Sequence, residues 1–360
     1  MHAESALLWW WLGVLDVRRY EVLKQYYGDL DTALTELSPE VLRGLKLRSD
    51  TIERVLERKH AFDAVRYRKE MERRGVTLLS LEDASYPSLL REIGDPPVFL
   101  SGIGDWSVLR CPLISMVGTR DMTSYGRRVV ETFVAPLVRA GFVTVSGLAL
   151  GIDAAVARQT TLHGGRTVAV LGNGLGSVYP PDNRNLSREI LEAGGLLLSE
   201  FPLETPPDKY TFPSRNRIIA GLSPATVVCE APEGSGSVIT AELALEYGRE
   251  VFAVPGPIFD EHRAGCHRLI AQNEARLMHS PSDLLRELGA APQDPQSTAY
   301  LPQEPHEKIL YGILSAMPRT VDDLAELTEL DASQISVALT MMELSGGVRN
   351  LGGGQWVRTY

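Results

Sequence analysis

Between residues 112 and 280, short apolar runs rich in β-branched residues alternate with stretches of helical spacing. No other feature constrains the fold as strongly, because continuous apolar runs are typical of strands buried on both faces of a parallel sheet. Strands that alternate with helices along a chain are joined by right-handed crossovers. The region is therefore predicted to be an α/β domain with a doubly wound sheet. Its expected strands are LISMV (113–117), FVTVS (142–146), TVAVL (167–171), GLLLS (195–199), ATVVC (225–229) and EVFAV (250–254).

The segments before this region have a different character. Residues 5–74 carry apolar side chains at helical spacing, interrupted by glycine and proline, which predicts four or five short helices. The stretch around Gly44 resembles a hairpin of two small helices, a unit that can bind a DNA backbone but serves at least as often for packing alone. Residues 76–106 predict one or two additional strands at the entry to the sheet.

A change in composition marks the end of the sheet region. Residues 291–305 contain four prolines and three glutamines, which is typical of a linker. We therefore expect a helical domain at 1–75, similar to SAM or helix-hairpin-helix domains, and the sheet domain at 76–290. The linker then leads to a third domain at 306–360.

This third domain has the element order of a winged helix. Three stretches of helical spacing, with Thr320 and Asp331 as expected N-caps, precede the Gly-rich hairpin VRNLGGGQWVR (348–358). A third helix that reads DNA needs Arg, Lys, Asn or Gln on its exposed face. Here it offers only Gln334, beside apolar residues and Glu343, so the pattern favours contact with protein over reading of DNA.

The charge balance limits how the protein could bind a polyanion. With 36 Lys and Arg against 46 Asp and Glu, the 360-residue chain has a formal charge of −10. This total argues against a surface coated in basic charge, although a local basic site can lie on an acidic body. Any anion site in the sheet domain must therefore be built by clustering cations.

Cysteine usage and the N-terminal sequence address the compartment. The three cysteines lie far apart without a CxxC motif, which argues against a disulfide framework or a zinc site and fits a reducing compartment. The apolar run ALLWWWLGVL (6–15) is too short to span a bilayer and lacks the flanks of a signal peptide. We expect a core helix there and a cytoplasmic protein with no membrane partner, no metal and no cofactor.

Glycine- and serine-rich turns follow most of the expected strands. In a parallel sheet these turns meet at one edge, where ligands bind beyond the carboxyl ends of the strands. Glycines let the backbone approach a ligand, and helix N-termini favour anions, so the turns together predict a phosphate-bearing ligand. None is a Walker loop or a GxGxxG motif, so ordinary dinucleotide binding is not indicated. The turns are 118–126, 146–153, 172–185 and 232–237.

Cationic and aromatic residues accompany these turns. Arg120 follows the first strand, Arg184 lies after the third, and Lys209 precedes Tyr210 and Phe212 after the fourth. Phosphates need cations and unstacked bases need aromatic faces, so this combination suits a single-stranded nucleic acid. In the alternative interpretation, Arg120 is a solvated loop residue that could pair with its neighbour Asp121.

The string SRNRIIAG adds Arg215, Asn216 and Arg217 to this region. Either arginine could instead form an internal salt bridge to a carboxylate that ends a strand, namely Glu200 or Glu230. We expect at least one of the two arginines to be structural.

Evidence for catalysis is weaker. Glu200, Glu230, Ser146 and Ser199 all end strands, but no histidine lies near them in a triad-like motif. Carboxylates that orient arginines are the commoner case. We therefore expect no catalytic residues and a protein that is not an enzyme.

Several strings in this region resemble the DNA-processing protein A family, DprA, also called Smf. They occur in the family's order between residues 110 and 280. The resemblance implies an extended Rossmann-like domain that binds single-stranded DNA without strong sequence preference. It further implies dimers, protection of incoming DNA during natural transformation, and loading of the RecA recombinase. The strings are VGTRDMTSYG, SGLALGID, LGNGLGSVYPPDN, SEFP, FPSRNRIIAGLS and EAPEGSGSVITAELALEYGREVFAVPG.

By its motifs, the resemblance places DNA contacts at Arg120, Lys209 and Arg184. Together with the residues of the Gly- and Ser-rich turns, they form one set of candidate positions at the sheet edge. The candidate DNA-binding residues are Gly118, Thr119, Arg120, Ser124, Ser146, Gly147, Arg184, Lys209, Phe212, Arg215, Asn216, Arg217, Ser235 and Ser237.

Two other functions remain open. PEGSGSVITAE faintly resembles the PGGxGTxxE loop of nucleoside-monophosphate phosphoribohydrolases, although Glu233 replaces a glycine and Ser237 a threonine. A sequence-specific regulator acting through the winged helix is disfavoured by the lack of basic residues on its third helix.

A possible dimer surface lies on the helix after the fifth expected strand. This helix has one apolar stripe at Ile239, Leu243 and Tyr247 and another at Ala241 and Leu245. Both stripes could equally be covered within the monomer.

Overall fold

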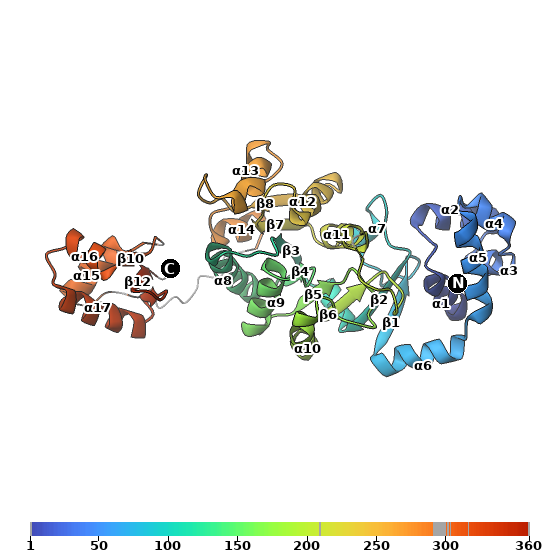
Figure 1. Cartoon of the computed structure of the whole chain (residues 1–360), viewed down its shortest axis with the longest axis horizontal. Coiled ribbons are helices and arrows are strands. Elements are labelled where there is room, and N and C mark those ends of the chain that lie inside the picture. Colours follow the sequence, from blue (N-terminus) through green and yellow to red (C-terminus); the bar gives the residue numbers. More distant parts are fainter. Residues whose placement is uncertain are drawn as a thin grey trace. The chain divides into compact units, whose positions relative to one another are not determined.

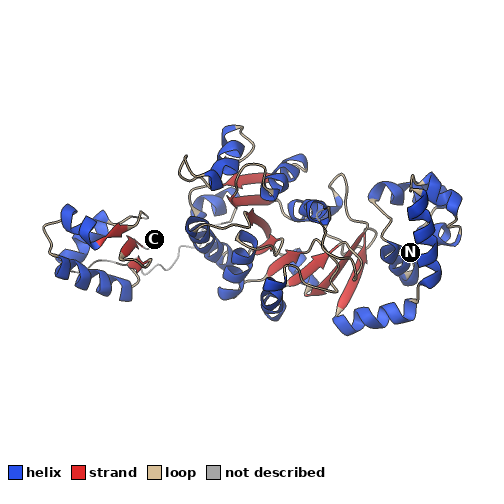
Figure 2. Cartoon of the chain, in the orientation of Figure 1, coloured by secondary structure: helices blue, strands red, loops and turns tan. Residues whose placement is uncertain are grey.

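The computed structural model describes residues 2–208, 210–290, 300, 302, 304–315 and 317–358. These residues form two compact units, divided between Pro292 and Gln293. Figure 1 follows the chain through both units, and Figure 2 separates helices from strands. Each unit is described by itself below.

The first unit is built on a mixed sheet. Within the described residues nine strands pair in the order β1-β2-β6-β5-β4-β3-β7-β8-β9. From β6 onward in this order, every pair of neighbouring strands is parallel. Strand β2 is antiparallel to both β6 and β1. All six strands expected from the apolar runs are confirmed. The strands are β1 (Val76–Ser80), β2 (Phe99–Gly104), β3 (Leu113–Gly118), β4 (Val143–Ser146), β5 (Thr167–Val170), β6 (Leu196–Ser199), β7 (Ala225–Glu230), β8 (Glu250–Ala253) and β9 (Arg276–Leu277).

Helices cover both faces of this sheet, which confirms the doubly wound α/β fold (Figure 2). Successive side chains of β3 enter opposite apolar layers: Ile114 and Met116 pack in one, Leu113 and Val117 in the other. One layer holds α8 (Ser124–Arg139), α9 (Ile152–Leu162), α10 (Arg184–Glu192) and α14 (Pro281–Glu287), and the other α7 (Ser88–Arg91), α11 (Thr211–Leu222), α12 (Gly236–Glu246) and α13 (Ala264–Ala271). Short 3-10 helices lie at Trp106–Arg110, Pro181–Asn183 and Glu261–Arg263.

Six helices precede the sheet in the fully described stretch 2–75, so the expectation of four or five was too low. The difference arises because α3 and α4 are only six residues long, too short for a clear apolar period. Their starts are nevertheless set by side-chain caps from Asp29 and Ser38. The helices are α1 (Ala3–Leu12), α2 (Val17–Tyr27), α3 (Leu30–Thr35), α4 (Pro39–Gly44), α5 (Ser49–Ala61) and α6 (Ala64–Arg74).

The tryptophan-rich run near the N-terminus is a core helix, as predicted. Trp9 and Trp10 of α1 are 0% and 2% exposed. They belong to an apolar cluster that also contains Phe99, Leu171 and Leu203 of the sheet domain. Among the described residues, no helix combines the length and the apolar character needed to cross a membrane.

The second unit has the winged-helix order that the sequence predicts. Its helices are α15 (Pro305–Ile313), α16 (Val321–Leu327) and α17 (Ala332–Leu344), and its sheet pairs β10 (Arg319–Thr320), β12 (Gln355–Arg358) and β11 (Val348–Asn350) in the order β10-β12-β11. Thr320 and Asp331 cap α16 and α17, each in a capping box.

Candidate nucleic-acid interface

The strand order of the sheet reverses at β3, which lies between β4 and β7. Ligands of open α/β sheets bind beyond the carboxyl ends of the strands at such a point. A pocket of about 420 Å³ lies there, and a recess of about 60 Å³ shares Arg120, Ala149, Phe212 and Arg215 with it. The pocket brings together Gly118, Thr119, Arg120, Phe212, Arg215, Asn216, Ser235 and Ser237 of the predicted residues, and the recess adds Gly147.

Arg120 is the exposed cation of this pocket. It leaves the sheet directly after β3, and its guanidinium carbon lies 5.3 Å from the centre of the Phe212 ring. In the part of the chain that the structure describes, no carboxylate pairs with Arg120; Asp121 lies instead 3.8 Å from Nε2 of His262. The charge of Arg120 is therefore available to an anion.

An aromatic pair extends the site from Arg120. The ring of Tyr179, which is 41% exposed, lies 5.6 Å from the Phe212 ring, with the two planes 40° apart. Tyr179, Phe212 and Arg120 thus form a row of two aromatic faces and a cation, which can hold unstacked bases and a phosphate. Tyr179 is not among the residues predicted from the sequence, although it lies close to Arg184 just as Phe212 lies close to Lys209.

Arg215 lies at the floor of the pocket and is only 4% exposed. Its Nη1 donates to the carbonyl oxygens of Gly147 and Val170, at the ends of β4 and β5. A side chain at Gly147 would overlap the guanidinium, because an added Cβ would lie closer to Nη1 than van der Waals contact allows. Burial lowers the pKa of Arg215 to about 10, and the nearby Asp153 opposes that shift. Arg215 therefore joins the ends of β4 and β5 and places a positive charge at the floor of the pocket.

Arg217 points away from the pocket into an internal salt bridge. Its Nη2 lies 2.6 Å from Oε2 of Glu200, and its Nε lies 3.2 Å from Oδ2 of Asp95. This confirms the expected pair between an arginine of the SRNR string and a strand-end carboxylate. Burial raises the pKa of Glu200, while Arg217 lowers it.

The other strand-end carboxylate, Glu230, is held by an arginine that the sequence analysis missed. Nη1 of Arg263 lies 2.9 Å from Oε1 of Glu230, and both side chains are fully buried. Thr123 donates to the same carboxylate through its backbone N–H at 3.1 Å and its hydroxyl at 2.6 Å. Arg263 also stacks on the ring of Tyr125, 4.0 Å from its centre. Together these contacts fix the start of α8 and so the loop that carries Arg120.

The N-terminus of α12 forms the opposite wall of the pocket. The hydroxyl oxygens of Ser235 and Ser237 lie 2.8 Å apart. Nδ2 of Asn216 donates to the carbonyl oxygen of Gly236 at 3.2 Å and so joins α11 to this wall. The helix α12 has no side-chain cap, and its N-terminal residues Ser235, Gly236 and Ser237 line the pocket, which places the positive end of the helix there.

Four of the predicted residues line neither the pocket nor the recess. Ser146 is buried and donates to the carbonyl oxygen of Met116 at 2.8 Å. Ser124 and Arg184 are exposed in the first turns of α8 and α10, and Arg217 is paired as described. Lys209 lies outside the described residues.

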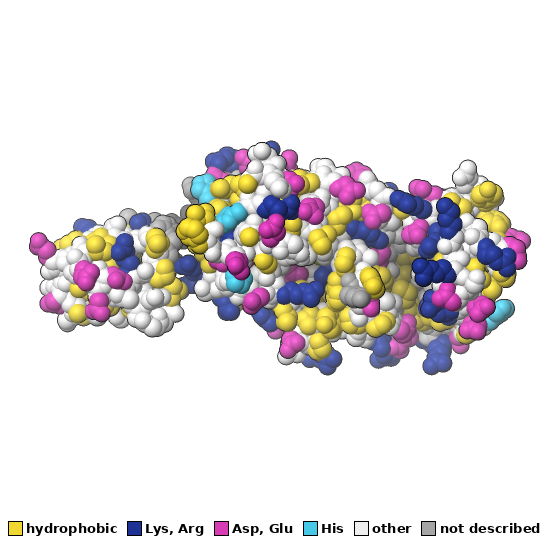
Figure 3. Space-filling view, turned by 45° about the horizontal axis from the view of Figure 1, so that its top comes forward, with side chains coloured by type: hydrophobic (Ala, Val, Ile, Leu, Met, Phe, Trp, Pro, Cys, Tyr) yellow, Lys and Arg dark blue, Asp and Glu magenta, His cyan; other side chains and the backbone are white. Residues whose placement is uncertain are grey.

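The charge pattern is local. On the face drawn in Figure 3, basic and acidic side chains are interspersed and do not form one continuous basic surface. Within the described residues, no group of three or more His, Cys, Asp or Glu side chains could hold a metal ion.

The third helix of the winged unit presents few groups that could read DNA. The Oε1 atom of Gln334 accepts the backbone N–H of Asp331 in the capping box. The exposed side chains of this helix include Val337, Met341 and Leu344, which are 63%, 52% and 80% exposed. An apolar exposed surface suits protein better than base edges.

Family models match both parts of the chain. The model described as DNA recombination-mediator protein A matches residues 77–289, and the DprA winged helix domain matches residues 289–354. Protein Smf of Synechocystis is 36% identical over 333 residues, covering 82% of this chain and 83% of that protein. DNA processing protein DprA of Bacillus subtilis is 43% identical over 215 residues, covering 59% of this chain and 72% of that protein.

Solved structures agree with these matches. The X-ray structure of DNA processing protein A from Streptococcus pneumoniae has a TM-score of 0.66 at 37% identity, covering 77% of this chain and 94% of that chain. A structure of the Helicobacter pylori protein, described for its single-stranded DNA binding mode, has a TM-score of 0.54 at 28% identity, covering 59% of this chain and 95% of that chain. The chain therefore belongs to the DNA recombination-mediator protein A family.

Proposed function

We propose that this protein binds single-stranded DNA in the crevice beyond the carboxyl ends of β3, β4, β5 and β7. The observation that carries the proposal is the row formed by Arg120, Phe212 and Tyr179. Stacking on aromatic faces tolerates every base, and cations bind phosphates regardless of sequence, so the binding has little sequence preference. Lys209 and Arg184 extend the site as further phosphate contacts.

The biological role proposed for this binding is that of a recombination mediator. The protein protects incoming single strands during natural transformation and loads RecA onto them. Membership of the recombination-mediator family supports this role. The three free cysteines of the described residues are consistent with the proposed location in the cytoplasm.

We further propose that the sheet domain forms a homodimer. On α12, Ala241 is buried and Leu243 and Tyr247 are partly covered, whereas Ile239 and Leu245 are 41% and 37% exposed. The monomer thus covers much of both predicted stripes. Ile239 lines the pocket, and Leu245 is the apolar side chain that stays available to a partner. The winged helix contacts protein through α17 in this proposal. The helical segment 1–75 is proposed as one domain that packs onto the sheet domain 76–290 through the apolar cluster to which both contribute.

The alternative, a nucleoside-monophosphate phosphoribohydrolase-like enzyme, has less support. Its phosphate loop would correspond to residues 232–237, of which Ser235, Gly236 and Ser237 line the pocket. However, Glu200 and Glu230, the carboxylates that end strands, are engaged by Arg217 and Arg263. Neither is positioned as a free general acid or base.

One experiment separates the two functions. Fluorescence anisotropy with a labelled oligothymidylate measures single-strand affinity, and a parallel assay measures release of base from nucleoside monophosphates. We expect binding that weakens with salt and no release of base. Release of base without single-strand binding would favour the enzyme and contradict the proposed function.

A further inference from the structure

Two neighbouring loops support the aromatic pair of the candidate site. The loop of residues 172–183 bears Tyr179, and the loop of residues 200–208 leads towards α11 and Phe212. The loops are joined by hydrogen bonds from the N–H of Gly174 to the carbonyl oxygen of Thr205, 2.9 Å, and from the N–H of Gly176 to that of Leu203, 3.0 Å. These two hydrogen bonds link the loops to each other.

Residues of the N-terminal helices form hydrogen bonds with both loops. The hydroxyl of Tyr67, on α6, accepts the N–H of Leu203 at 3.2 Å and donates to Oε2 of Glu204 at 3.2 Å. Nε1 of Trp10 donates to the carbonyl oxygen of Glu200 at 2.9 Å. Burial and the adjacent Glu204 raise the pKa of Tyr67, so its hydroxyl keeps the proton that it donates.

A third contact reaches the other loop. Nη1 of Arg74, at the end of α6, donates to the carbonyl oxygen of Gly176 at 2.8 Å. The adjacent Arg73 shares the carboxylate of Glu70 with Arg74 but, among the described residues, forms no hydrogen bond or ion pair with either loop. Arg74 thus joins the helical segment to the loop that bears Tyr179.

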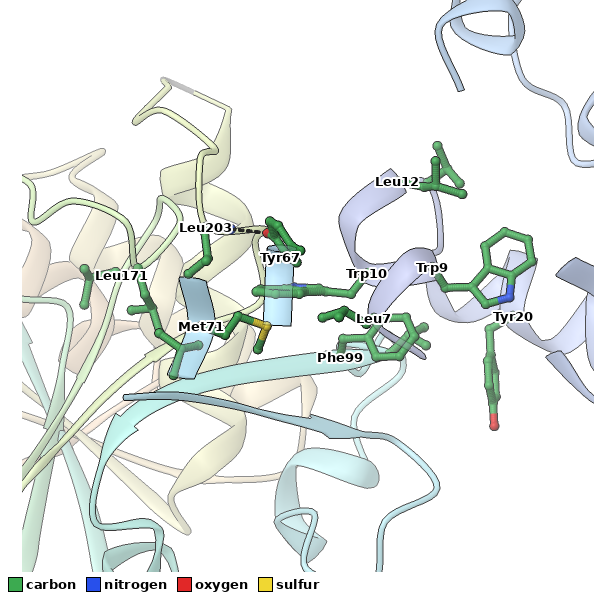
Figure 4. Close-up of a cluster of buried hydrophobic side chains, with 14 of the residues drawn as sticks. Leu7, Trp9, Trp10, Leu12, Tyr20, Tyr67, Met71, Phe99, Leu171 and Leu203 are labelled. Atoms are coloured by element: carbon green, nitrogen blue, oxygen red, sulfur yellow. Dashed lines mark hydrogen bonds between the residues drawn. The ribbon is translucent and has the colours of Figure 1, made fainter. Parts of the chain in front are cut away.

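Apolar packing reinforces these hydrogen bonds. Figure 4 shows Trp10, Tyr67 and Met71 of the helical segment gathered beside Leu203, with the hydrogen bond from Leu203 to Tyr67 drawn. All belong to one buried cluster, which also contains Leu175 of the 172–183 loop. The helical segment and both loops therefore share a core, and the loops cannot shift without disturbing it.

From these contacts we propose that the N-terminal helical segment is a positioning module for the single-strand site, acting through Tyr67 and Arg74 on the loops that carry Tyr179 and lead to Phe212. The proposal rests on the proposed function and gives the helical segment a role in it. A loop held in its binding conformation before the ligand arrives does not lose conformational freedom on binding. Tyr67 and Arg74 thus raise affinity without touching DNA.

The sharpest test compares two neighbouring arginines. Arg74→Gln and Arg73→Gln in the full-length protein remove the same charge from the same end of α6, and only Arg74→Gln removes the hydrogen bond to Gly176. Hydrogen–deuterium exchange across residues 172–183 is measured together with affinity for labelled oligothymidylate. We expect faster exchange in this loop and roughly three- to tenfold weaker binding for Arg74→Gln, as loss of one typical intramolecular hydrogen bond implies. Arg73→Gln retains both wild-type values.

A second pair of variants, at tyrosines, keeps the proposal testable if the arginine variants misfold. Tyr67→Phe removes only the hydroxyl that contacts Leu203 and Glu204. Its control is Tyr20→Phe, in the same helical segment. This change removes a hydroxyl that contacts Glu82 at 2.9 Å and Lys24 at 3.3 Å, and neither of these residues belongs to the two loops. Tyr67→Phe should weaken single-strand binding while Tyr20→Phe does not, at matched melting temperatures.

Arg120→Glu, measured in the same assay, separates failure of this proposal from failure of the proposed function. If Arg120→Glu binds as wild type does, the site itself is wrongly placed. If Arg120→Glu loses binding while folded Arg74→Gln and Tyr67→Phe match their controls in affinity and loop exchange, the site stands and the positioning role is overturned.

Discussion

Arg120, Arg215 and Arg217 lie close together in the fold but are held in different ways. Arg215 is bonded to strand-end carbonyl groups and Arg217 to carboxylates, whereas Arg120 is exposed above the Phe212 ring. An anion arriving in the pocket can approach the guanidinium of Arg120 without breaking an internal pair. We therefore expect the contribution of each arginine to binding to depend on its partners more than on its distance from the pocket.

Charge reversal at Arg120 should disrupt binding without disrupting the fold. We expect Arg120→Glu to weaken single-strand affinity at least tenfold and to lower the slope of log affinity against log salt by about 0.7 for each phosphate that is no longer neutralised. Anisotropy titrations at several salt concentrations measure both quantities. Arg139→Glu, at the exposed far end of α8, serves as the control for net charge. Equal affinities for the two folded variants would remove Arg120 from the site.

At the scale of elements, a buried ion pair connects the last crossover of the sheet with the Arg120 loop. Arg263, just before α13, pairs with Glu230 at the end of β7, and both contact Thr123 at the N-cap of α8. A buried charge that loses its partner pays its full desolvation cost. Loss of either partner would therefore weaken the contacts among β7, the start of α8 and the segment before α13.

Removing one partner should therefore destabilise the whole sheet domain. We expect Arg263→Leu to lower the free energy of unfolding by about 3–5 kcal/mol. Arg268→Leu, on α13 itself, breaks partly exposed pairs with Glu242 and Glu274, each of which should contribute less than about 1 kcal/mol. Urea unfolding of the two full-length variants measures the difference. Equal midpoints would show that the buried pair contributes no more than the exposed one.

At the scale of the whole molecule, we predict that the first of the two compact units binds single-stranded DNA without the second. The winged unit offers exposed Val337, Met341 and Leu344 on α17 and has Gln334 engaged in a cap. We expect deletion of residues 306–360 to leave single-strand affinity within about twofold of wild type, since the proposed phosphate-binding cations all remain. A titration of the monodisperse truncated protein tests this. A large loss of affinity would place part of the site on the winged unit.

Self-association is the second prediction at this scale. Two symmetric copies can hold two segments of one strand, and the second segment then binds at high effective concentration. We expect residues 1–290 to have twice the monomer mass in light scattering at micromolar concentration. If residues 1–290 have the monomer mass and bind single strands as tightly as the full-length protein does, both the dimer and the avidity argument are rejected.

Much of this architecture follows from local sequence. The apolar runs predicted β3 to β8 because strands buried on both faces need side chains such as Val, Ile and Leu throughout. Thr320 and Asp331 marked the starts of α16 and α17 because a cap acts within its own turn. The position of the pocket was also predictable, since the carboxyl ends of parallel strands meet at one edge wherever the strands are parallel.

The roles of individual side chains at that edge were decided by tertiary contacts. Arg215 and Arg217 are two residues apart in one string, yet one reaches Gly147 and the other Glu200. The buried partner of Glu230 is Arg263, 33 positions later in the chain, and Tyr67 reaches Leu203 across 136 positions. Local sequence preferences do not predict such pairs, because the energies of the pairs depend on burial and on distances that exist only once the layers have packed.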